Sequence, residues 1–267
     1  MRRGIVALAL VVLASAHAAL AQAPASVFLE DLTSPELANA VAAGTTTILI
    51  PVGGTEQNGP HMVLGKHNVR AKVLAGRIAR ELGNALVAPV ITYVPEGGVN
   101  PPTGHMRYPG TITVPVDVYR KTLEAAARSF RLAGFRDIVF LGDHGDYQKD
   151  NEHVARQLNR EWTRAAVRAH ALGEYYRAAT DGFARSLKAR GYADAEIGLH
   201  GGLADTSLAL AVDPGIVRAS QLQAAAGSSA FGVSGDPRRA TAELGKTGVD
   251  AIVIQSVAAI RAAIAHR

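Results

Sequence analysis

The sequence predicts an α/β domain in which a mostly parallel sheet is covered by helices on both faces. Short apolar runs alternate along the chain with segments of 12 to 20 residues whose apolar positions recur at helical spacing. The runs are apolar almost throughout, which is typical of strands that are buried on both faces of a parallel sheet. No internal repeat, low-complexity tract or linker divides the sequence. We therefore expect a single domain over residues 22–267.

The strands are expected where short apolar runs end in polar or Gly-rich turns. The first run, TTILIPV, is rich in β-branched residues and precedes a Gly-rich loop. The third, DIVFLG, precedes the polar run DHGDYQKDNEH. The predicted strands are 46–52, 85–93, 137–142 and 165–172.

The helices are expected in the connections between these strands. The first shows apolar residues at helical spacing from Val69 to Leu82 and ends at Gly83, a natural stop. The second opens with Pro115 and has Asp117 in its first turn, where an acidic side chain is favourable. The Gly- and Pro-rich segment 96–110 is a long loop of the kind that is often functional. The predicted helices are 68–83, 115–134, 150–162, 174–191, 203–212 and 239–266.

Residues 1–21 have the features of a cleaved export signal. Arg2 and Arg3 precede an apolar run over 5–16, and the sequence ALA at 19–21 fits a signal peptidase site. The alternative is an N-terminal membrane anchor, but about a dozen apolar residues are fewer than the roughly 20 that span a bilayer. No later apolar run reads as a membrane span. The sequence therefore predicts a periplasmic or secreted protein.

Composition limits the kinds of site that the chain can build. It contains no cysteine, so disulfides and thiolate metal sites are excluded, and a metal must be held by His and carboxylate. Without Arg2 and Arg3, 26 Lys and Arg remain against 23 Asp and Glu, a balance of +3. The basic residues are spread along helical segments rather than clustered with aromatics, so no nucleic-acid surface is expected.

Titratable side chains gather where the predicted strands end. Glu56 lies four residues past the first strand, and His144 and Asp146 lie just past the third. Loops at the carboxyl ends of parallel strands open on the same edge of the sheet. A third Gly-rich segment carries His200 and Asp205. Taken singly, these residues could be a solvated carboxylate, a turn histidine or a helix cap; together they suit a Zn²⁺ or Mn²⁺ site.

Five stretches that span nearly all of residues 22–267 resemble the creatininase family in family order. That family comprises metal-dependent amidohydrolases that open cyclic amides, with relatives implicated in peptide maturation. The resemblance implies a three-layer sandwich, a small-molecule amide substrate and a homo-oligomer such as a hexamer. The stretches are PVGGTEQNGPHMVLG at 51–65, the loop from His105 to the sequence PGTIT, IVFLGDHGD at 138–146, HGGLADTS at 200–207 and GDPRRATAELGKTGVDAIV at 235–253.

The first loop departs from the family pattern, which resembles E-x-H-G-x-H-L-P-x-G-x-D. Glu56 matches a metal ligand, but Asn58 stands in place of a ligand His. His67 stands in place of an Asp that bridges two metals, and His61 matches a His that lies beside the ligands. A carboxylate can bridge two cations, whereas a neutral imidazole binds one. The resemblance therefore implies one ion rather than two, held by Glu56, His67 and His144.

The other motifs depart less. His144 matches a ligand His, Asp146 lies at an acidic position of one family variant, and Asp205 replaces a ligand Glu. Asp146 or Asp205 could accept a proton from a metal-activated water or bind a weaker second ion. We expect His200 to orient the substrate carbonyl or protonate the leaving nitrogen. His105, on the long loop, is expected to contact the substrate.

These residues predict an exported metal-dependent hydrolase of C–N bonds in a cyclic amide or small peptide-like substrate. Creatinine itself is not expected, because Leu199 replaces the catalytic Glu of creatinine-opening members. A rival hypothesis is a creatininase-like pseudoenzyme that binds a ligand or partner without turnover, which Asn58, His67 and Leu199 favour. A scaffolding protein of the cell envelope is a further alternative.

Overall fold

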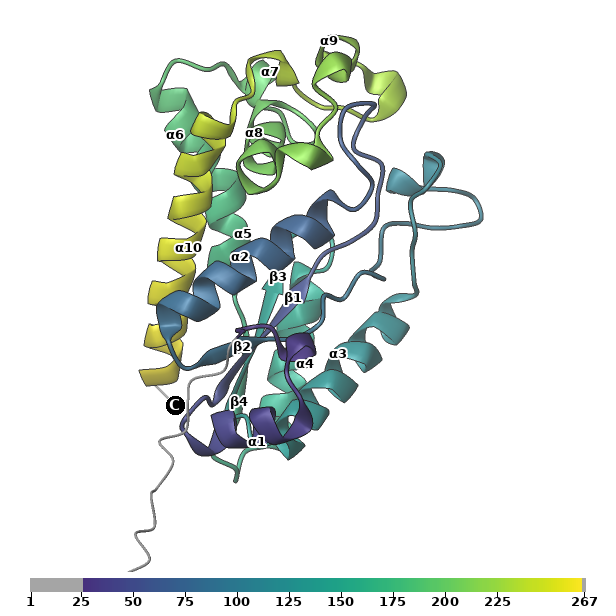
Figure 1. Cartoon of the computed structure of the whole chain (residues 1–267). Helices are drawn as coiled ribbons and strands as arrows, with labels where there is room; N and C mark the ends of the chain where they lie inside the picture. Colours follow the sequence, from purple (N-terminus) through teal and green to yellow (C-terminus); the bar gives the residue numbers. More distant parts are fainter. Residues whose placement is uncertain (1–25, 266–267) are drawn as a thin grey trace, which may run out of the picture.

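The computed structural model describes residues 26–265. The predicted export signal, 1–21, lies outside the described residues. Within them the chain builds a parallel sheet between two layers of helices, which confirms the predicted α/β architecture (Figure 1).

The sheet has the strand order β2-β1-β3-β4, and every pairing is parallel. Its central strands, β1 and β3, have six residues each and are buried along their whole length. The second strand is shorter than the predicted 85–93, because Pro89 has no N–H to donate and interrupts the pairing; Ile91 then meets β1 again at a single bridge with Val52. The strands are β1 (Thr47–Val52), β2 (Ala85–Val87), β3 (Asp137–Gly142) and β4 (Arg168–Ala171).

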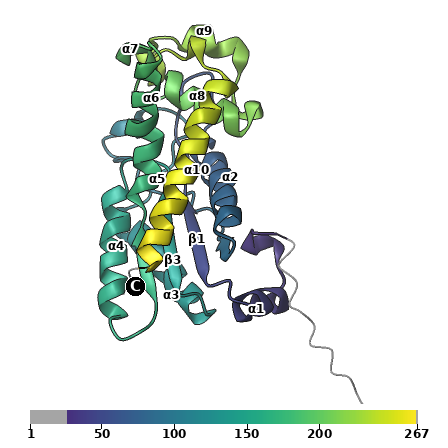
Figure 2. The ribbon, with the colours of Figure 1, turned by 90° about the vertical axis from the view of Figure 1, so that its left-hand side faces the viewer.

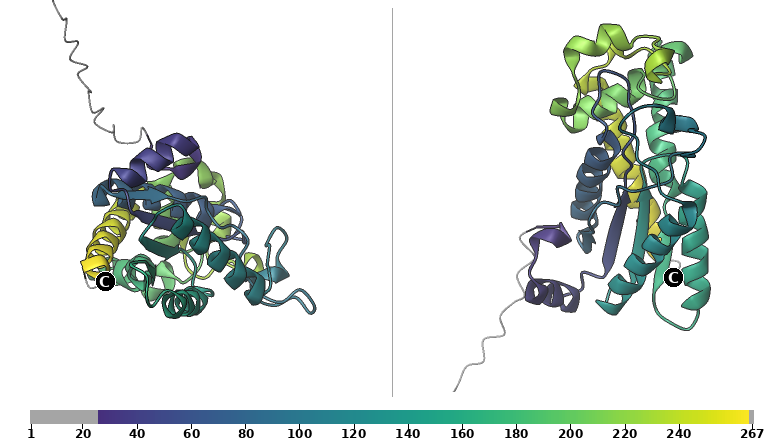
Figure 3. Two further views of the ribbon diagram at one scale, coloured as in Figure 1. Left: turned by 90° about the horizontal axis from the view of Figure 1, so that it is seen from below. Right: turned by 90° about the vertical axis from the view of Figure 1, so that its right-hand side faces the viewer.

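Successive side chains of the central strands point into two separate hydrophobic cores. Leu49, Val139 and Leu141 face one core, whereas Ile48 and Phe140 face the other. Figures 2 and 3 show the helices of the two layers on opposite sides of the sheet. The first core is covered by α2 (Lys66–Leu82), α5 (Gly173–Arg177), α6 (Phe183–Ala189), α8 (Leu203–Val212) and α10 (Ala242–Ala265); the second by α3 (Val116–Leu132) and α4 (Gln148–Glu161).

Beyond shifts of one to three residues at the ends of α3, α4 and α10, the helices differ from the expectations in three ways. The first predicted helix begins at Lys66 rather than at 68, which makes Lys66 and His67 part of its first turn. The predicted helix 174–191 is interrupted by a π-helical turn at Ala178–Gly182. Helix α1 (Ser34–Ala42) was not predicted; it opens at a capping box in which Thr33 and Glu36 pair. Two further short helices are α7 (Asp194–Ile197) and α9 (Leu222–Ala225).

Several loops contain short 3₁₀ turns. One lies inside the predicted long loop 96–110, and most of the others flank α8 and α9 near the carboxyl edge of the sheet. They are Leu29–Asp31, Gly104–Arg107, Pro214–Ile216, Ala219–Gln221, Ser229–Phe231 and Pro237–Arg239.

Helix α10 is the one helix among the described residues that is long and apolar enough to cross a membrane. The sequence alone had not marked it as a span. In the structure, Val249, Ile252 and Ile260 on one side of α10 are buried in the core shared with α2 and α8. Its apolar character is therefore accounted for, over this face, by packing within the domain.

Candidate metal centre

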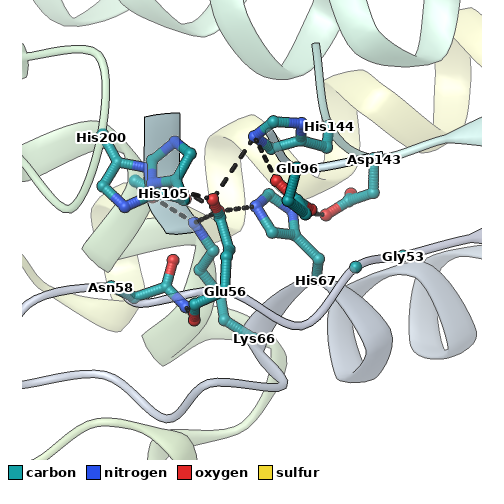
Figure 4. Close-up of polar contacts among 12 residues, drawn as sticks. Gly53, Glu56, Asn58, Lys66, His67, Glu96, His105, Asp143, His144 and His200 are labelled. Carbon is teal, nitrogen blue, oxygen red and sulfur yellow. Dashed lines mark hydrogen bonds and ion pairs between the residues drawn. The ribbon is translucent and has the colours of Figure 1, made fainter. Parts of the chain in front are cut away.

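The loops that follow β1 and β3 meet the Gly-rich segment before α8 at the carboxyl edge of the sheet (Figure 4). Glu56, on the first loop, is fully buried at their meeting point. Its Oε1 atom lies 2.7 Å from His67 Nε2, 3.7 Å from His200 Nδ1 and 3.8 Å from Lys66 Nζ. One oxygen of this carboxylate is therefore surrounded by nitrogen atoms.

The other oxygen of Glu56 faces a different pair of histidines. Oε2 lies 3.2 Å from His105 Nδ1 and 3.5 Å from His144 Nε2. It is buried and has no hydrogen-bond partner among the described residues. Two sets of three potential ligands thus share Glu56, one with His67 and His144 and one with His105 and His200.

His67 is oriented by a carboxylate on its far side. Its Nδ1 atom lies 2.6 Å from Asp143 Oδ2, while Nε2 points to Glu56. A carboxylate that accepts from one ring nitrogen fixes the tautomer that leaves the other nitrogen free for a metal. The arrangement therefore suits His67 Nε2 as a ligand.

Asp143 belongs to a buried network that the sequence did not reveal. Arg70 Nε donates to both of its oxygens, at 3.0 and 2.9 Å, and the Tyr175 hydroxyl donates to Oδ1 at 2.7 Å. Burial alone would raise the pKa of Asp143, but Arg70 and His67 outweigh it and the pKa is lowered. The network holds a charged carboxylate directly behind His67.

Asp205, predicted as a ligand, lies in ion pairs instead. Its Oδ2 accepts from Lys66 Nζ at 2.6 Å and from the Gly201 N–H at 3.0 Å, and Oδ1 accepts from Arg70 at 2.7 Å. Burial acts to raise its pKa, yet Lys66 and Arg70 hold the pKa well below its usual value. Both oxygens accept hydrogen bonds, so in this arrangement Asp205 positions the side chains of Lys66 and Arg70 and does not offer a free ligand atom.

Asn58 and His61 hold the first loop in shape. The Asn58 amide donates to the carbonyls of Glu56 and Val63, at 2.8 and 3.1 Å, so it braces the loop from within. His61 Nε2 lies 2.9 Å from the Thr206 hydroxyl and thereby ties the loop to α8. Both residues lie beside the candidate ligands, and neither has an atom in the candidate ligand groups of the described residues.

His200 and His105 are linked by one amide. Gln57 Nε2 lies 3.0 Å from His105 Nδ1 and 3.2 Å from His200 Nε2, and the same His200 nitrogen lies 2.8 Å from the Gln57 carbonyl. If His200 Nε2–H donates to that carbonyl, Nδ1 faces Glu56. Burial lowers the pKa of His200 to about 4, with a further contribution from Lys66, so a neutral imidazole faces the carboxylate.

His144 and Asp146 follow β3 on a loop that Tyr147 anchors. The Tyr147 hydroxyl accepts from the backbone N–H groups of Asp143 and His144, at 3.1 and 2.9 Å, and lies 2.6 Å from the Gly53 carbonyl. It therefore joins the loops that follow β1 and β3. Asp146 is exposed at the mouth of the site and forms a third candidate ligand group with His144 and Glu96.

The charges of His144 and Glu56 favour the binding of a cation between them. Burial would lower the pKa of His144, but the negative charge of Glu56 raises it to about 9. Burial would likewise raise the pKa of Glu56, but His144 and His67 hold it well below its usual value. An imidazolium and a carboxylate therefore face one another, and an incoming cation would replace the proton of His144.

A cavity of about 390 Å³ adjoins this cluster and is lined by His67, His144 and His200 on one side. The buried charged side chains Lys66, Arg70 and Asp143 also line it, and Tyr176, Thr180 and residues of α8 complete much of its wall. Leu199 is 95% exposed at its rim. The cavity gives a small molecule access to the imidazoles.

Comparisons with known proteins assign the chain to a family. The family profile described as "Creatininase: Creatinine amidohydrolase" matches residues 30–260. The chain belongs to the creatininase family. It is 28% identical over 195 residues to the creatinine amidohydrolase of Pseudomonas putida, covering 72% of this chain and 74% of that protein. It is also 28% identical over 225 residues to a mycofactocin precursor peptide peptidase of Mycobacterium ulcerans, covering 75% and 78%.

Solved structures of creatininase share the fold. The structure described as "Creatininase Mn" superposes with a TM-score of 0.73 at 25% identity and covers 90% of this chain and 99% of that chain. The creatininase resemblance noted from the sequence motifs is thereby confirmed.

The structure brings together most of the side chains that the sequence singled out and adds four. Glu56, His67, His105, His144 and His200 converge, whereas Asp146 lies at the mouth. The additions, all buried, are Lys66, Arg70, Glu96 and Asp143. The position of Asp143 directly after DIVFLG was an available signal, because a residue there opens on the ligand edge. Lys66 and Arg70 gave no such signal in the sequence, because Lys and Arg on a helix are usually exposed to solvent.

Proposed function

We propose that this protein is an exported metal-dependent hydrolase of C–N bonds that acts on a cyclic amide or a small peptide-like amide. The observation that carries the proposal is the pair formed by Glu56 and His144. A buried carboxylate oxygen without a hydrogen-bond donor among the described residues faces an imidazole nitrogen, and three further histidines lie within reach of the same carboxylate. Buried charges in proteins are paired or coordinate metals.

The residues present fit a divalent ion. Glu56, His67 and His144 would hold it, and two imidazoles with one carboxylate are the ligand types of catalytic zinc sites. Imidazole and carboxylate also accept Mn²⁺, the ion named in the description of one solved creatininase. One ion is proposed rather than two, because Asn58 braces the loop and Asp205 is held by Lys66 and Arg70.

A bound ion would supply Lewis acidity and an activated water near neutral pH. The chain's own groups would do the rest. His200, neutral and facing the cavity, would orient the substrate carbonyl or pass a proton to the leaving nitrogen. Asp146, at the mouth, would accept a proton, and His105, on the long loop, would contact the substrate.

The proposed substrate class follows from the relatives and from the cavity. One relative is a creatinine amidohydrolase and another a peptide peptidase, so amide cleavage is common to both names. Leu199 provides an apolar rim where creatinine-opening relatives place an acid, so creatinine itself is not the proposed substrate. Periplasmic or secreted location is proposed from residues 1–21, and a homo-oligomer such as a hexamer from the family resemblance.

The function can be tested on the purified mature protein stripped of metal. Reconstitution with ZnCl₂ or MnCl₂ is expected to restore about one equivalent per chain by elemental analysis. Hydrolysis of a panel of cyclic amides and dipeptides is expected to appear only in the reconstituted protein. Absence of bound metal at excess Zn²⁺ and Mn²⁺ would reject the proposal.

One observation favours the pseudoenzyme as a second candidate. Glu56 Oε1 already contacts His67 and lies near Lys66, so half of this carboxylate is compensated without any metal. In that case the cavity beside His200 would bind a ligand without turnover. Saturable binding of an amide by a chain that holds no metal and shows no hydrolysis would select this candidate.

Lys66→Met is expected to tighten metal binding about tenfold, because the ammonium beside Glu56 and Asp205 repels a divalent ion on the same carboxylate. Competition with a chromogenic chelator measures the dissociation constant for Zn²⁺. Lys72→Met is the matched control: Lys72 lies on the same helix, is half-exposed, and contacts Glu30 and the Phe28 ring away from the site. Equal affinity in Lys66→Met and Lys72→Met would show that Lys66 does not oppose the ion.

A further inference from the structure

Glu96 is a buried carboxylate whose role neither the sequence motifs nor the family resemblance assigns. Its side chain is 0% exposed, and neither of its oxygens has a hydrogen-bond partner among the described residues. An uncompensated carboxylate in the interior is costly unless a cation or a proton satisfies it. A group of this kind calls for an explanation other than packing.

The backbone around Glu96 holds the side chain in place. The Glu96 N–H donates to the Thr113 hydroxyl at 3.0 Å, and the neighbouring Val94 carbonyl accepts from Val114. Across the loop, Gly54 has a φ of +147°, and a Cβ built there would lie 2.6 Å from Glu96 Oε1. The first loop therefore leaves room for this carboxylate by having no side chain at residue 54.

The Glu96 carboxylate points toward His144. Its Oε2 lies 3.8 Å from His144 Nε2, the same nitrogen that lies 3.5 Å from Glu56 Oε2 (Figure 4). The opposite oxygen of Glu56 is occupied by His67 and Lys66. The unpartnered oxygens of two buried carboxylates thus border one imidazole nitrogen, on the side away from the lysine.

We propose that Glu96 is a ligand of the metal ion, supplying a second carboxylate beside Glu56 and His144. This inference rests on the proposed metal-dependent function and adds a ligand to it. Glu96 would compensate for the carboxylate that His67 replaced, from a different loop. A second carboxylate makes the set richer in oxygen, which shifts its preference toward Mn²⁺ relative to a two-His, one-carboxylate set.

Glu96→Gln tests the proposal, because it keeps the shape of the side chain and removes its charge. The stripped variant and the wild type are titrated with ZnCl₂ and MnCl₂ against a chelator, and the thermal midpoint is recorded with and without metal. The Kd for metal is expected to rise at least about tenfold. The midpoint of the metal-free variant is expected to stay at or above that of the wild type, since no hydrogen bond is lost.

Glu124→Gln is the matched control, with the same chemical change at a remote carboxylate on α3. Equal metal affinity of Glu96→Gln and Glu124→Gln would overturn the proposal while leaving the proposed function intact. A metal-free Glu96→Gln that melts well below the wild type would assign Glu96 a structural role instead. A wild type that binds no metal would overturn the proposed function together with the inference.

If Glu96→Gln does not fold, Glu96→Asp provides a second variant, because it keeps the charge and shortens the side chain by one methylene, which withdraws the carboxylate from His144. Weaker metal binding by at least about threefold supports the proposal, and unchanged affinity contradicts it.

Discussion

Arg70→Met is expected to destabilise the protein by about 3–5 kcal/mol, because it leaves buried carboxylates without their cation. Arg70 is 4% exposed and bonds to both Asp143 and Asp205. Methionine restores the volume but none of the five N–H donors. Lys66 still pairs with Asp205, so the larger loss falls on Asp143.

Urea unfolding followed by circular dichroism measures the change as a shift of the midpoint at constant slope. Arg128→Met is the matched control, since Arg128 pairs with Glu161 and Glu124 at the surface and such pairs contribute about 0–1 kcal/mol. If the two variants lose similar stability, the buried network does not stabilise the fold. Both measurements are made on metal-free protein, so that ion binding does not contribute.

Glu56→Gln is expected to abolish metal binding at micromolar Zn²⁺ or Mn²⁺. Glu56 is common to two of the three candidate ligand groups among the described residues, and its two oxygens face different sets of histidines. An amide has one neutral oxygen in place of two charged ones, and its NH₂ donor would face histidine nitrogens whose lone pairs are already used by the metal. The expected loss is larger than for Glu96, which belongs to one of these candidate groups, whereas Glu56 belongs to two.

Elemental analysis after dialysis against metal measures the result. Glu174→Gln, an exposed carboxylate that pairs with Arg177 on α5, is the control and is expected to keep the wild-type content. Full metal content in Glu56→Gln would contradict the assignment of this residue as the central ligand. Far-ultraviolet circular dichroism of the variant establishes that it is folded when the content is measured.

Much of the fold could be predicted because local pattern and burial agree. The runs TTILIPV and DIVFLG became β1 and β3, and α8 begins and ends at the predicted residues. Helix α1 was missed because its signal is a capping box rather than a long apolar repeat. The second strand was predicted too long, because Pro89 interrupts the pairing with β1, which beyond it resumes as a single bridge between Ile91 and Val52.

The sequence predicted most of the residues of the site but not which of their side chains contact one another. The carboxyl ends of parallel strands lie at one edge of the sheet, so the loops that carry Glu56 and His144 could be expected to lie close together. Which side chains pair there depends on contacts between residues far apart in sequence. Lys66 meets Asp205 across 139 positions, and a side-chain charge alone does not indicate such a partner.

The sequence by itself determined the parallel sheet, the edge at which imidazoles and carboxylates gather, and the exchange of ligand types at Asn58 and His67. Only the tertiary structure decided how the charges are shared. It placed Lys66 and Arg70 on Asp205 and gave the oxygens of Glu96, near His144, no hydrogen-bond partner within residues 26–265. The physical reason is that apolar periodicity encodes burial along one element, whereas the partner of a buried charge is set by the positions of several loops at once.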